Sequence, residues 1–137
     1  MSAGYSGTPL VKKLGLVAGA RVVALSEPPA FREALGPLPE GVALRDRLRG
    51  PADVVVVFVT SRAELERRLA AAGKAIFPAG AIWVAWPKKA SKVPTDVTED
   101  VVRAVALPTG LVDTKVCAID ETWSGLRVVW RKERRVG

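Results

Sequence analysis

The sequence contains no histidine, and its 137 residues include no asparagine or glutamine. The absence of histidine removes the most common general base and metal ligand of enzymes. A single cysteine, Cys117, excludes an internal disulfide and every zinc site that needs several cysteines. There is also no Walker loop and no nucleophile elbow. Hydrolase and metalloenzyme interpretations therefore lack their usual parts, and we assign no catalytic or metal-binding residue.

Long apolar runs are also missing. No run approaches the roughly 20 residues that a membrane-spanning helix needs. Residues 1–5 show no basic segment followed by an apolar core, so we expect no signal peptide. These absences predict a cytoplasmic protein with no membrane partner.

Charge of one sign predominates. Lysine and arginine total 21 against 14 acidic residues, which gives a net charge of +7 and a pI near 10.1. Such a charge permits binding to nucleic acid or another polyanion, although a solvated basic surface has the same composition. The lack of asparagine and glutamine, together with abundant arginine, proline and alanine, is typical of a thermophile or of a GC-rich genome.

The most informative stretch is the continuous apolar run at residues 53–60, Asp-Val-Val-Val-Val-Phe-Val-Thr. A turn signal at Gly50 and Pro51 precedes it, and an amphipathic helical pattern follows it. A strand without polar alternation must be buried on both faces, which predicts the central strand of a parallel sheet covered by helices on both sides. We expect near-complete burial of Val55, Val57, Val59 and Ile82.

Further extended runs define the rest of the sheet. Right-handed crossovers predict the strand order 2-1-3-4-6-5, with only the sixth strand antiparallel. Trp83 and Trp86 are an odd number of positions apart, so they should face opposite sides of their strand. The pattern predicts an α/β fold in one domain spanning residues 1–137. The expected strands cover residues 21–25, 42–44, 53–60 and 81–86, followed by a hairpin of residues 112–120 and 126–131 around a loop at residues 121–125.

Local signals predict four helices. Thr8 and Pro9 begin the first, which Gly15 ends in the left-handed conformation. The second extends from Ser26 through Leu35. The third begins with the capping box of Ser61 and Glu64 and ends at Gly73, and Thr95 caps the fourth.

Three segments resemble S-adenosylmethionine-dependent methyltransferases. Residues 14–23 are similar to the lead-in to their first strand, residues 51–55 to the start of their fourth strand, and residues 77–82 to the turn into their fifth. The terminal hairpin is similar to their closing pair of strands. The resemblance implies a three-layer, Rossmann-like fold with a mostly parallel sheet.

The loop after the first strand departs from that family. Methyltransferases have a glycine-rich loop there, because glycine allows the backbone to approach the ligand closely. This chain instead has Ser26-Glu27-Pro28-Pro29-Ala30-Phe31, with two prolines that lack amide donors. We therefore expect no cofactor, and in particular no S-adenosylmethionine site of the usual kind.

A closer resemblance joins residues 4–10, residues 86–88 and above all residues 112–127, Val-Asp-Thr-Lys-Val-Cys-Ala-Ile-Asp-Glu-Thr-Trp-Ser-Gly-Leu-Arg. These segments resemble a bacterial family known as domain of unknown function 3052. The resemblance implies a small cytoplasmic bacterial protein and carries no activity with it.

Ligands of open α/β sheets bind beyond the carboxyl ends of the strands, where the strand order reverses. The side chains that should gather at that edge provide carboxylates, hydroxyls, ammonium groups and an indole. They form the candidate binding surface: Ser26, Glu27, Thr60, Ser61, Lys88, Lys89, Asp120, Glu121 and Trp123.

Each of these residues also has a purely structural explanation. Ser61 caps a helix, Glu27 suits a helix dipole, and Asp120 can bond turn amides. Lys88 and Lys89 suit a solvated loop. Trp123 either marks a functional surface or folds back on the fourth helix as a core plug. Cys117 is most simply a small apolar residue in mid-strand, on the same face as Lys115.

The sequence therefore favours a non-enzymatic α/β binding or regulatory domain whose ligand is a protein partner or a small anion. One alternative is an enzyme that acts on a small anionic substrate at the carboxyl edge. Another is a nucleic-acid-associated protein that uses Lys88, Lys89, Lys92 and the basic tail at residues 132–135.

Overall fold

The fold is organised around β3 (Val54–Phe58), all five residues of which are buried. In this computed structural model, which describes residues 8–135, β3 lies inside a six-stranded sheet of order β2-β1-β3-β4-β6-β5. The first four strands in that order pair in parallel, and β6 runs antiparallel to both of its neighbours. The predicted order and directions are confirmed.

Most strand limits differ from the prediction by one to a few residues, and two differences change the assignment of particular residues. The second strand is Leu44–Arg45 rather than residues 42–44. Trp123 is the first residue of β6 rather than part of the loop, because it pairs with Pro87 at the end of β4. The other strands are β1 (Val22–Leu25), β4 (Ala81–Pro87), β5 (Leu111–Ala118) and β6 (Trp123–Trp130).

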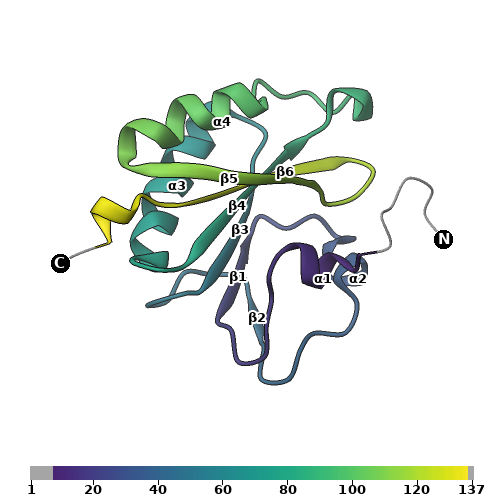
Figure 1. Ribbon diagram of the computed structural model, residues 1–137. Helices are drawn as coiled ribbons and strands as arrows, with labels where there is room; N and C mark the ends of the chain where they lie inside the picture. The colour runs from purple at the N-terminus through teal and green to yellow at the C-terminus, as the bar shows by residue number, and fades with distance from the viewer. Residues whose placement is uncertain (1–7, 136–137) are drawn as a thin grey trace.

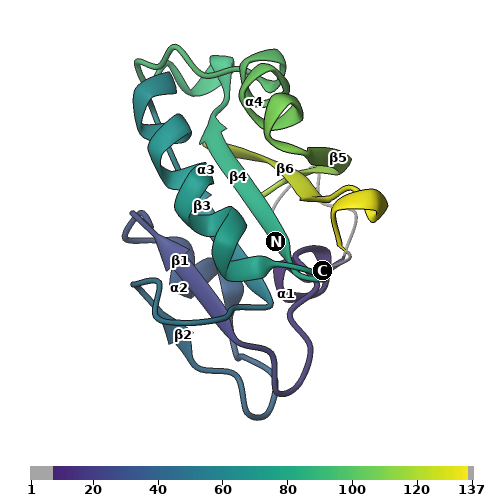
Figure 2. The ribbon, with the colours of Figure 1, turned by 90° about the vertical axis from the view of Figure 1, so that its left-hand side faces the viewer.

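Helices cover both faces of the sheet, which produces the expected three layers (Figures 1 and 2). Side chains of α3 and α4 pack on one face, and side chains of α1 and α2 pack on the other. None of the helices in residues 8–135 is both long and apolar enough to cross a membrane. The helices are α1 (Leu10–Lys13), α2 (Phe31–Leu35), α3 (Arg62–Ile76) and α4 (Glu99–Ala106), with short 3₁₀ turns at η1 (Lys89–Ser91), η2 (Leu107–Thr109) and η3 (Lys132–Arg134).

The sheet separates two apolar cores. Val55 and Val57 point toward α3 and α4, whereas Val54, Val56 and Phe58 point toward α1 and α2. Trp86 belongs to the first core and Trp83 to the second, so the prediction that they face opposite sides is confirmed. The predicted core residues Val55, Val57, Val59 and Ile82 are at most 1% exposed.

Helix α3 does not end at Gly73, as the sequence predicted, but continues to Ile76. Trp130 of β6 lies over this glycine, and a Cβ there would come within 3.1 Å of the indole ring. The indole Nε1 also donates a hydrogen bond to the carbonyl oxygen of Gly73 at 2.9 Å. Gly73 is therefore a packing residue inside the helix. The predicted left-handed end of α1 is confirmed at Gly15, where φ is +75°.

The caps of the other helices also differ from the prediction. Thr98, not Thr95, caps α4, because its Oγ1 accepts a hydrogen bond from the amide of Val101 at 3.2 Å. Thr95 instead joins the preceding loop to β3 by donating to the carbonyl oxygen of Thr60 at 2.7 Å. Helix α2 begins only at Phe31, after a turn in which its amide donates to the carbonyl of Pro28.

The central position of β3 predicts that Val57→Ala lowers the free energy of unfolding by about 1–3 kcal/mol, through lost apolar burial and a residual cavity. Val17→Ala is the matched control, because Val17 is 65% exposed and its truncation should change stability by less than about 0.5 kcal/mol. Urea unfolding of both variants measures the difference. Equal stability of Val57→Ala and the wild type would contradict the central-strand assignment.

Candidate functional site

The predicted surface residues lie at the carboxyl ends of the strands. Ser26 follows β1, Thr60 follows β3 and Lys88 follows β4. The loop between β5 and β6 reaches the same edge, because the amide of Lys88 donates to the carbonyl of Thr122 at 2.7 Å. The topology thus places the candidate residues along one edge of the sheet.

The residues after β1 bond to neighbouring arginines. The Glu27 carboxylate accepts hydrogen bonds from Nε of Arg32 at 3.1 Å and from its Nη2 at 3.0 Å. Ser26 has φ of +58°, and its Oγ accepts from Nη2 of Arg68 at 3.1 Å. Nε of Arg68 is buried and has no hydrogen-bond acceptor among the described residues. Both polar groups that follow β1 are therefore held by internal contacts.

The residues after β3 have capping roles. Oγ of Ser61 accepts from the amide of Glu64 at 3.1 Å, as the capping box predicts. The Glu64 carboxylate reaches back to the amide of Thr60, one residue before the cap, at 3.4 Å. The carbonyl of Thr60 is the acceptor for Thr95. These contacts account for Ser61 and for the backbone of Thr60 without a ligand.

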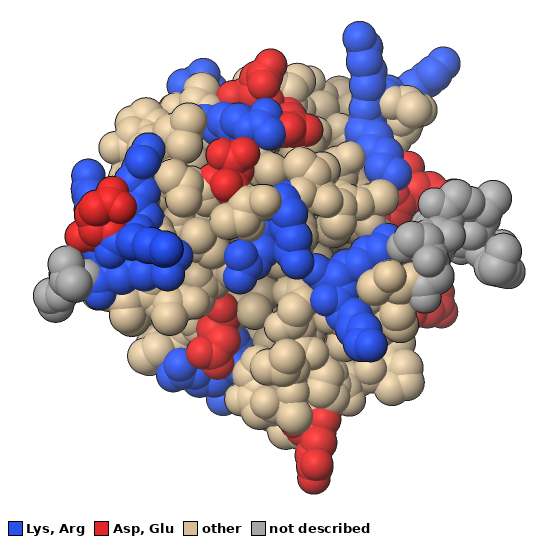
Figure 3. Space-filling model, in the orientation of Figure 1, with Lys and Arg blue, Asp and Glu red and all other residues tan. Residues whose placement is uncertain are grey.

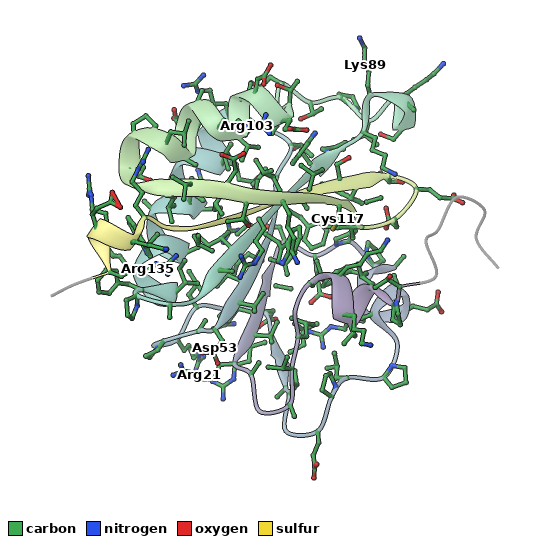
Figure 4. The ribbon with its side chains drawn as sticks, viewed as in Figure 1. Arg21, Asp53, Lys89, Arg103, Cys117 and Arg135 are labelled. Carbon is green, nitrogen blue, oxygen red and sulfur yellow. The ribbon has the colours of Figure 1, made fainter. Side chains whose placement is uncertain are left out.

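The hairpin loop forms a tight turn. Oδ1 of Asp120 accepts from the amides of Thr122 and Trp123, both at 2.8 Å, which is the usual role of aspartate in turns. Glu121 is exposed. Lys89 is also exposed and points away from the fold (Figure 4).

Trp123 is half-buried and packs inward. Its ring meets Phe58 edge-on at a centroid distance of 5.1 Å, and Phe58 meets Phe31 in the same way at 4.9 Å. This aromatic row lies in the core on the α1 and α2 side of the sheet. The alternative that Trp123 packs against α4 is therefore wrong, because α4 covers the opposite face.

Several cavities lie apart from the predicted surface residues. Four cavities among the described residues have volumes of about 440–590 Å³, and none of the nine predicted residues lines them. The largest of these four, about 590 Å³, is at the amino ends of β1, β3 and β4, where residues 13–15 and 17–20 form one wall. Trp83 fixes that wall to β4, since its Nε1 donates to the carbonyl of Leu14 at 3.0 Å. We call this space the amino-edge cavity.

Three cationic side chains line the amino-edge cavity, Lys13 from α1, Lys115 from β5 and Arg127 from β6. In Figure 3, basic side chains gather over the middle of β5 and β6 and beside it over α1. The sequence analysis did not identify this group, because its members lie far apart along the chain. The sequence did contain one sign of this group, because the alternation of β5 places Lys115 on the same face as Cys117.

The one carboxylate in the cavity lining is already paired. Asp53 accepts hydrogen bonds from the amide of Arg21 at 2.8 Å, from its Nε at 3.1 Å and from its Nη2 at 3.0 Å. Figure 4 shows the two side chains together. The Arg21 side chain, followed by the backbone amide, holds the pKa of the Asp53 carboxyl below its ordinary value.

Cys117 lines a smaller neighbouring cavity together with Lys13 and Lys115. Burial raises the pKa of its thiol, and the two lysine charges act in the opposite direction. The thiol is thus disfavoured as a thiolate, which agrees with the structural interpretation of this cysteine. Among residues 8–135, no three Cys, Asp or Glu side chains gather closely enough to hold a metal ion.

Comparisons with known proteins identify a family and a fold. The model of a family described as "Protein of unknown function (DUF3052)" matches residues 32–132, more than half of the chain. No functionally curated protein is similar enough to count as a match.

Solved structures with a similar fold include methyltransferases. A SAM-dependent methyltransferase from Aquifex aeolicus is 14% identical with a TM-score of 0.56, over 87% of this chain and 86% of that one. Ribosomal protein L11 methylase from Lactobacillus delbrueckii subsp. bulgaricus is 9% identical with a TM-score of 0.61, over 89% and 75%. TrmN from Thermus thermophilus is 11% identical with a TM-score of 0.58, over 89% of this chain and 47% of that one. This chain thus spans about half of TrmN, and identities this low show the fold alone.

The packing of Trp123 predicts that Trp123→Ala lowers the free energy of unfolding by about 2–3 kcal/mol. This is less than the loss for fully buried aromatic residues, about 3–5 kcal/mol, because Trp123 is only half-buried. Trp123→Phe is the control, because it keeps an aromatic edge against Phe58 and should lose less than half as much. Chemical denaturation measures both variants. A wild-type stability for Trp123→Ala would instead favour the functional interpretation of this indole.

The Asp53–Arg21 pair predicts a pH-dependent difference. Because the pKa of Asp53 is lowered in the folded state, the pair stabilises the fold above the unfolded pKa of about 3.9, and this contribution disappears as the pH falls through the folded pKa. Arg21→Leu should lower stability at pH 7 only slightly, since both side chains are largely exposed and solvent screens the pair.

The Arg21→Leu difference should shrink below pH 4, and the NMR-measured pKa of Asp53 should rise in the variant. Arg21→Lys retains the positive charge but not the guanidinium fork, so its stability should lie between those of the wild type and Arg21→Leu. An unchanged Asp53 pKa in Arg21→Leu would contradict the pairing.

Proposed function

The chain belongs to the DUF3052 family of proteins of unknown function, and from that premise we propose that it is a non-enzymatic binding domain with the methyltransferase frame but without its cofactor site. Its ligand on this proposal is a small anion. The observation that carries the proposal is the state of the carboxyl edge, where Ser26, Glu27, Ser61 and Asp120 already bond to neighbouring groups of the protein.

The residues at that edge do not fit S-adenosylmethionine. By the general rule for open α/β sheets, the cofactor would lie beyond β1, beside Ser26 and Glu27. Arg32 occupies both oxygens of the Glu27 carboxylate, and Arg68 holds Ser26. Pro28 and Pro29 have no amide hydrogen to offer, and the five-residue helix α2 begins only after them.

The same contacts argue against an enzyme at this edge. General acid–base catalysis needs a group within hydrogen-bond reach of the substrate proton. Glu27 is bonded to Arg32, and Asp120 supports the turn amides of Thr122 and Trp123. The aromatic row of Trp123, Phe58 and Phe31 fills the space beside the end of β3. These contacts support a binding role elsewhere on the molecule.

Isothermal titration calorimetry with S-adenosylmethionine tests the proposal. We expect no heat of binding at high protein concentration, because the prolines and the arginine contacts close the edge. S-adenosylhomocysteine should give the same result, and a methyltransferase of similar fold provides the positive control. A micromolar dissociation constant for either compound would overturn the proposal.

A further inference from the structure

We propose that the amino-edge cavity is a binding site for a small molecule that carries a phosphate group, held by Lys115, Arg127 and Lys13. The proposal deepens the proposed function and rests on it, since it gives the small anion a place and a chemical class. The site lies at the opposite edge of the sheet from the one where open α/β folds usually bind ligands.

Two of the three cations stand directly opposite each other in the sheet. Lys115 of β5 pairs with Arg127 of β6 in the antiparallel register. Like charges at directly opposed positions destabilise a sheet. Within residues 8–135, no carboxylate forms an ion pair with either side chain. No carboxylate of the described residues therefore offsets this repulsion, and a bound anion would relieve it.

A β-bulge creates this arrangement. Asp113 pairs with Val128 and Lys115 with Arg127, so Thr114 is an extra residue in β5. Side chains two positions apart normally share a face, but the extra residue moves Lys115 to the opposite face from Asp113. Asp113 thereby accepts a hydrogen bond from Nε of Arg103 on α4 at 3.0 Å. Lys115 joins Arg127, and neither is ion-paired with a carboxylate in the part of the chain that the structure describes.

The bulge residue also positions Arg127. Oγ1 of Thr114 accepts from Nη1 of Arg127 at 3.2 Å and lies 3.3 Å from the carbonyl oxygen of Arg127, to which it donates. Arg127 is half-buried, and burial followed by the charge of Arg135 lowers its pKa. A guanidinium remains charged even so, and its fork matches the geometry of a phosphate. An ordered, partly desolvated arginine of this kind binds anions more strongly than a solvated one.

The shape favours a small molecule over a polymer. The volume of about 590 Å³ lies within the range of small-molecule sites, about 300–1,000 Å³. Lys13 lines the cavity on the α1 side, and Asp53 is ion-paired with Arg21. Leu14, Val17, Val54 and Ala81 provide apolar lining for the part of the ligand that carries no charge.

Calorimetric titration of the full chain with inorganic pyrophosphate in low salt tests the site. We expect measurable binding by the wild type and at least a tenfold weaker affinity for the double variant Lys115→Ala/Arg127→Gln. The matched control is Lys89→Ala/Lys92→Ala. It also removes two positive charges, but from the loop after β4, and should change the affinity less than twofold. Lys115→Ala alone, at an exposed position, should weaken binding about threefold or more and provides the test if the double variant does not fold.

Thermal melting without ligand gives a second readout. Relief of repulsion predicts that Lys115→Ala melts at or above the wild-type temperature, and a lower melting temperature would assign the lysine a structural role and overturn the proposal. Absence of pyrophosphate binding by the wild type would overturn the proposal. Equally weakened pyrophosphate affinity in both double variants would also overturn it, because it would show that binding depends only on the overall charge of the protein.

The nucleic-acid alternative predicts tight binding of duplex DNA, with an affinity that falls steeply as salt increases. If both double variants weakened that binding equally, the result would favour this alternative and overturn the proposed site. Failure of the proposed function would be seen separately, as binding of S-adenosylmethionine.

Discussion

Burial of β3 on both faces is the constraint on which the rest of the structure depends. A parallel strand of five buried residues cannot face water on either side, so each side of the sheet needs its own helical layer. Val55 and Val57 pack under α3 and α4, and Val54, Val56 and Phe58 pack under α1 and α2. The strand thereby separates two cores. Because β1 and β4 are parallel to β3, the loops that follow these strands lie at the carboxyl edge of the sheet and the loops that precede them lie at the amino edge.

The sequence was sufficient for the sheet because its signals are local. Apolar runs mark the strands, and the short loop between the last two runs requires an antiparallel pair. Helix ends were predicted less well, because long-range contacts decide them. Gly73 has the local signature of a helix end, yet α3 continues past it because the indole of Trp130, 57 residues away, fills the space where a side chain would lie. No local pattern around Gly73 contains that contact.

The contacts of the candidate residues also divide into those that local sequence predicts and those that depend on long-range packing. Their common edge follows from parallel strands, and the turn role of Asp120 and the cap role of Ser61 follow from local chemistry. The arginine that bonds to Ser26 could not be inferred, since the Arg68 contact depends on how α3 packs on the sheet. The amino-edge cavity was missed for a related reason. It joins α1 to the hairpin across about a hundred residues of sequence, and a general rule directs attention to the other edge.

The two edges of the sheet differ in how their charges are balanced. At the carboxyl edge, Glu27 and Asp120 both have internal partners, so a ligand there would have to displace existing bonds. At the amino edge, one extra residue, Thr114, separates Asp113 from Lys115 and places two cations opposite each other. Without that bulge, Asp113 and Lys115 would share a face, and the carboxylate would be available to neutralise the lysine. A strand that needed only stability would favour that simpler register, because it avoids both the unpaired residue and the repulsion. The proposed anion site accounts for the bulge, which exposes an arginine held by Thr114 and a lysine beside it. Both line a cavity, and neither is ion-paired with a carboxylate of residues 8–135.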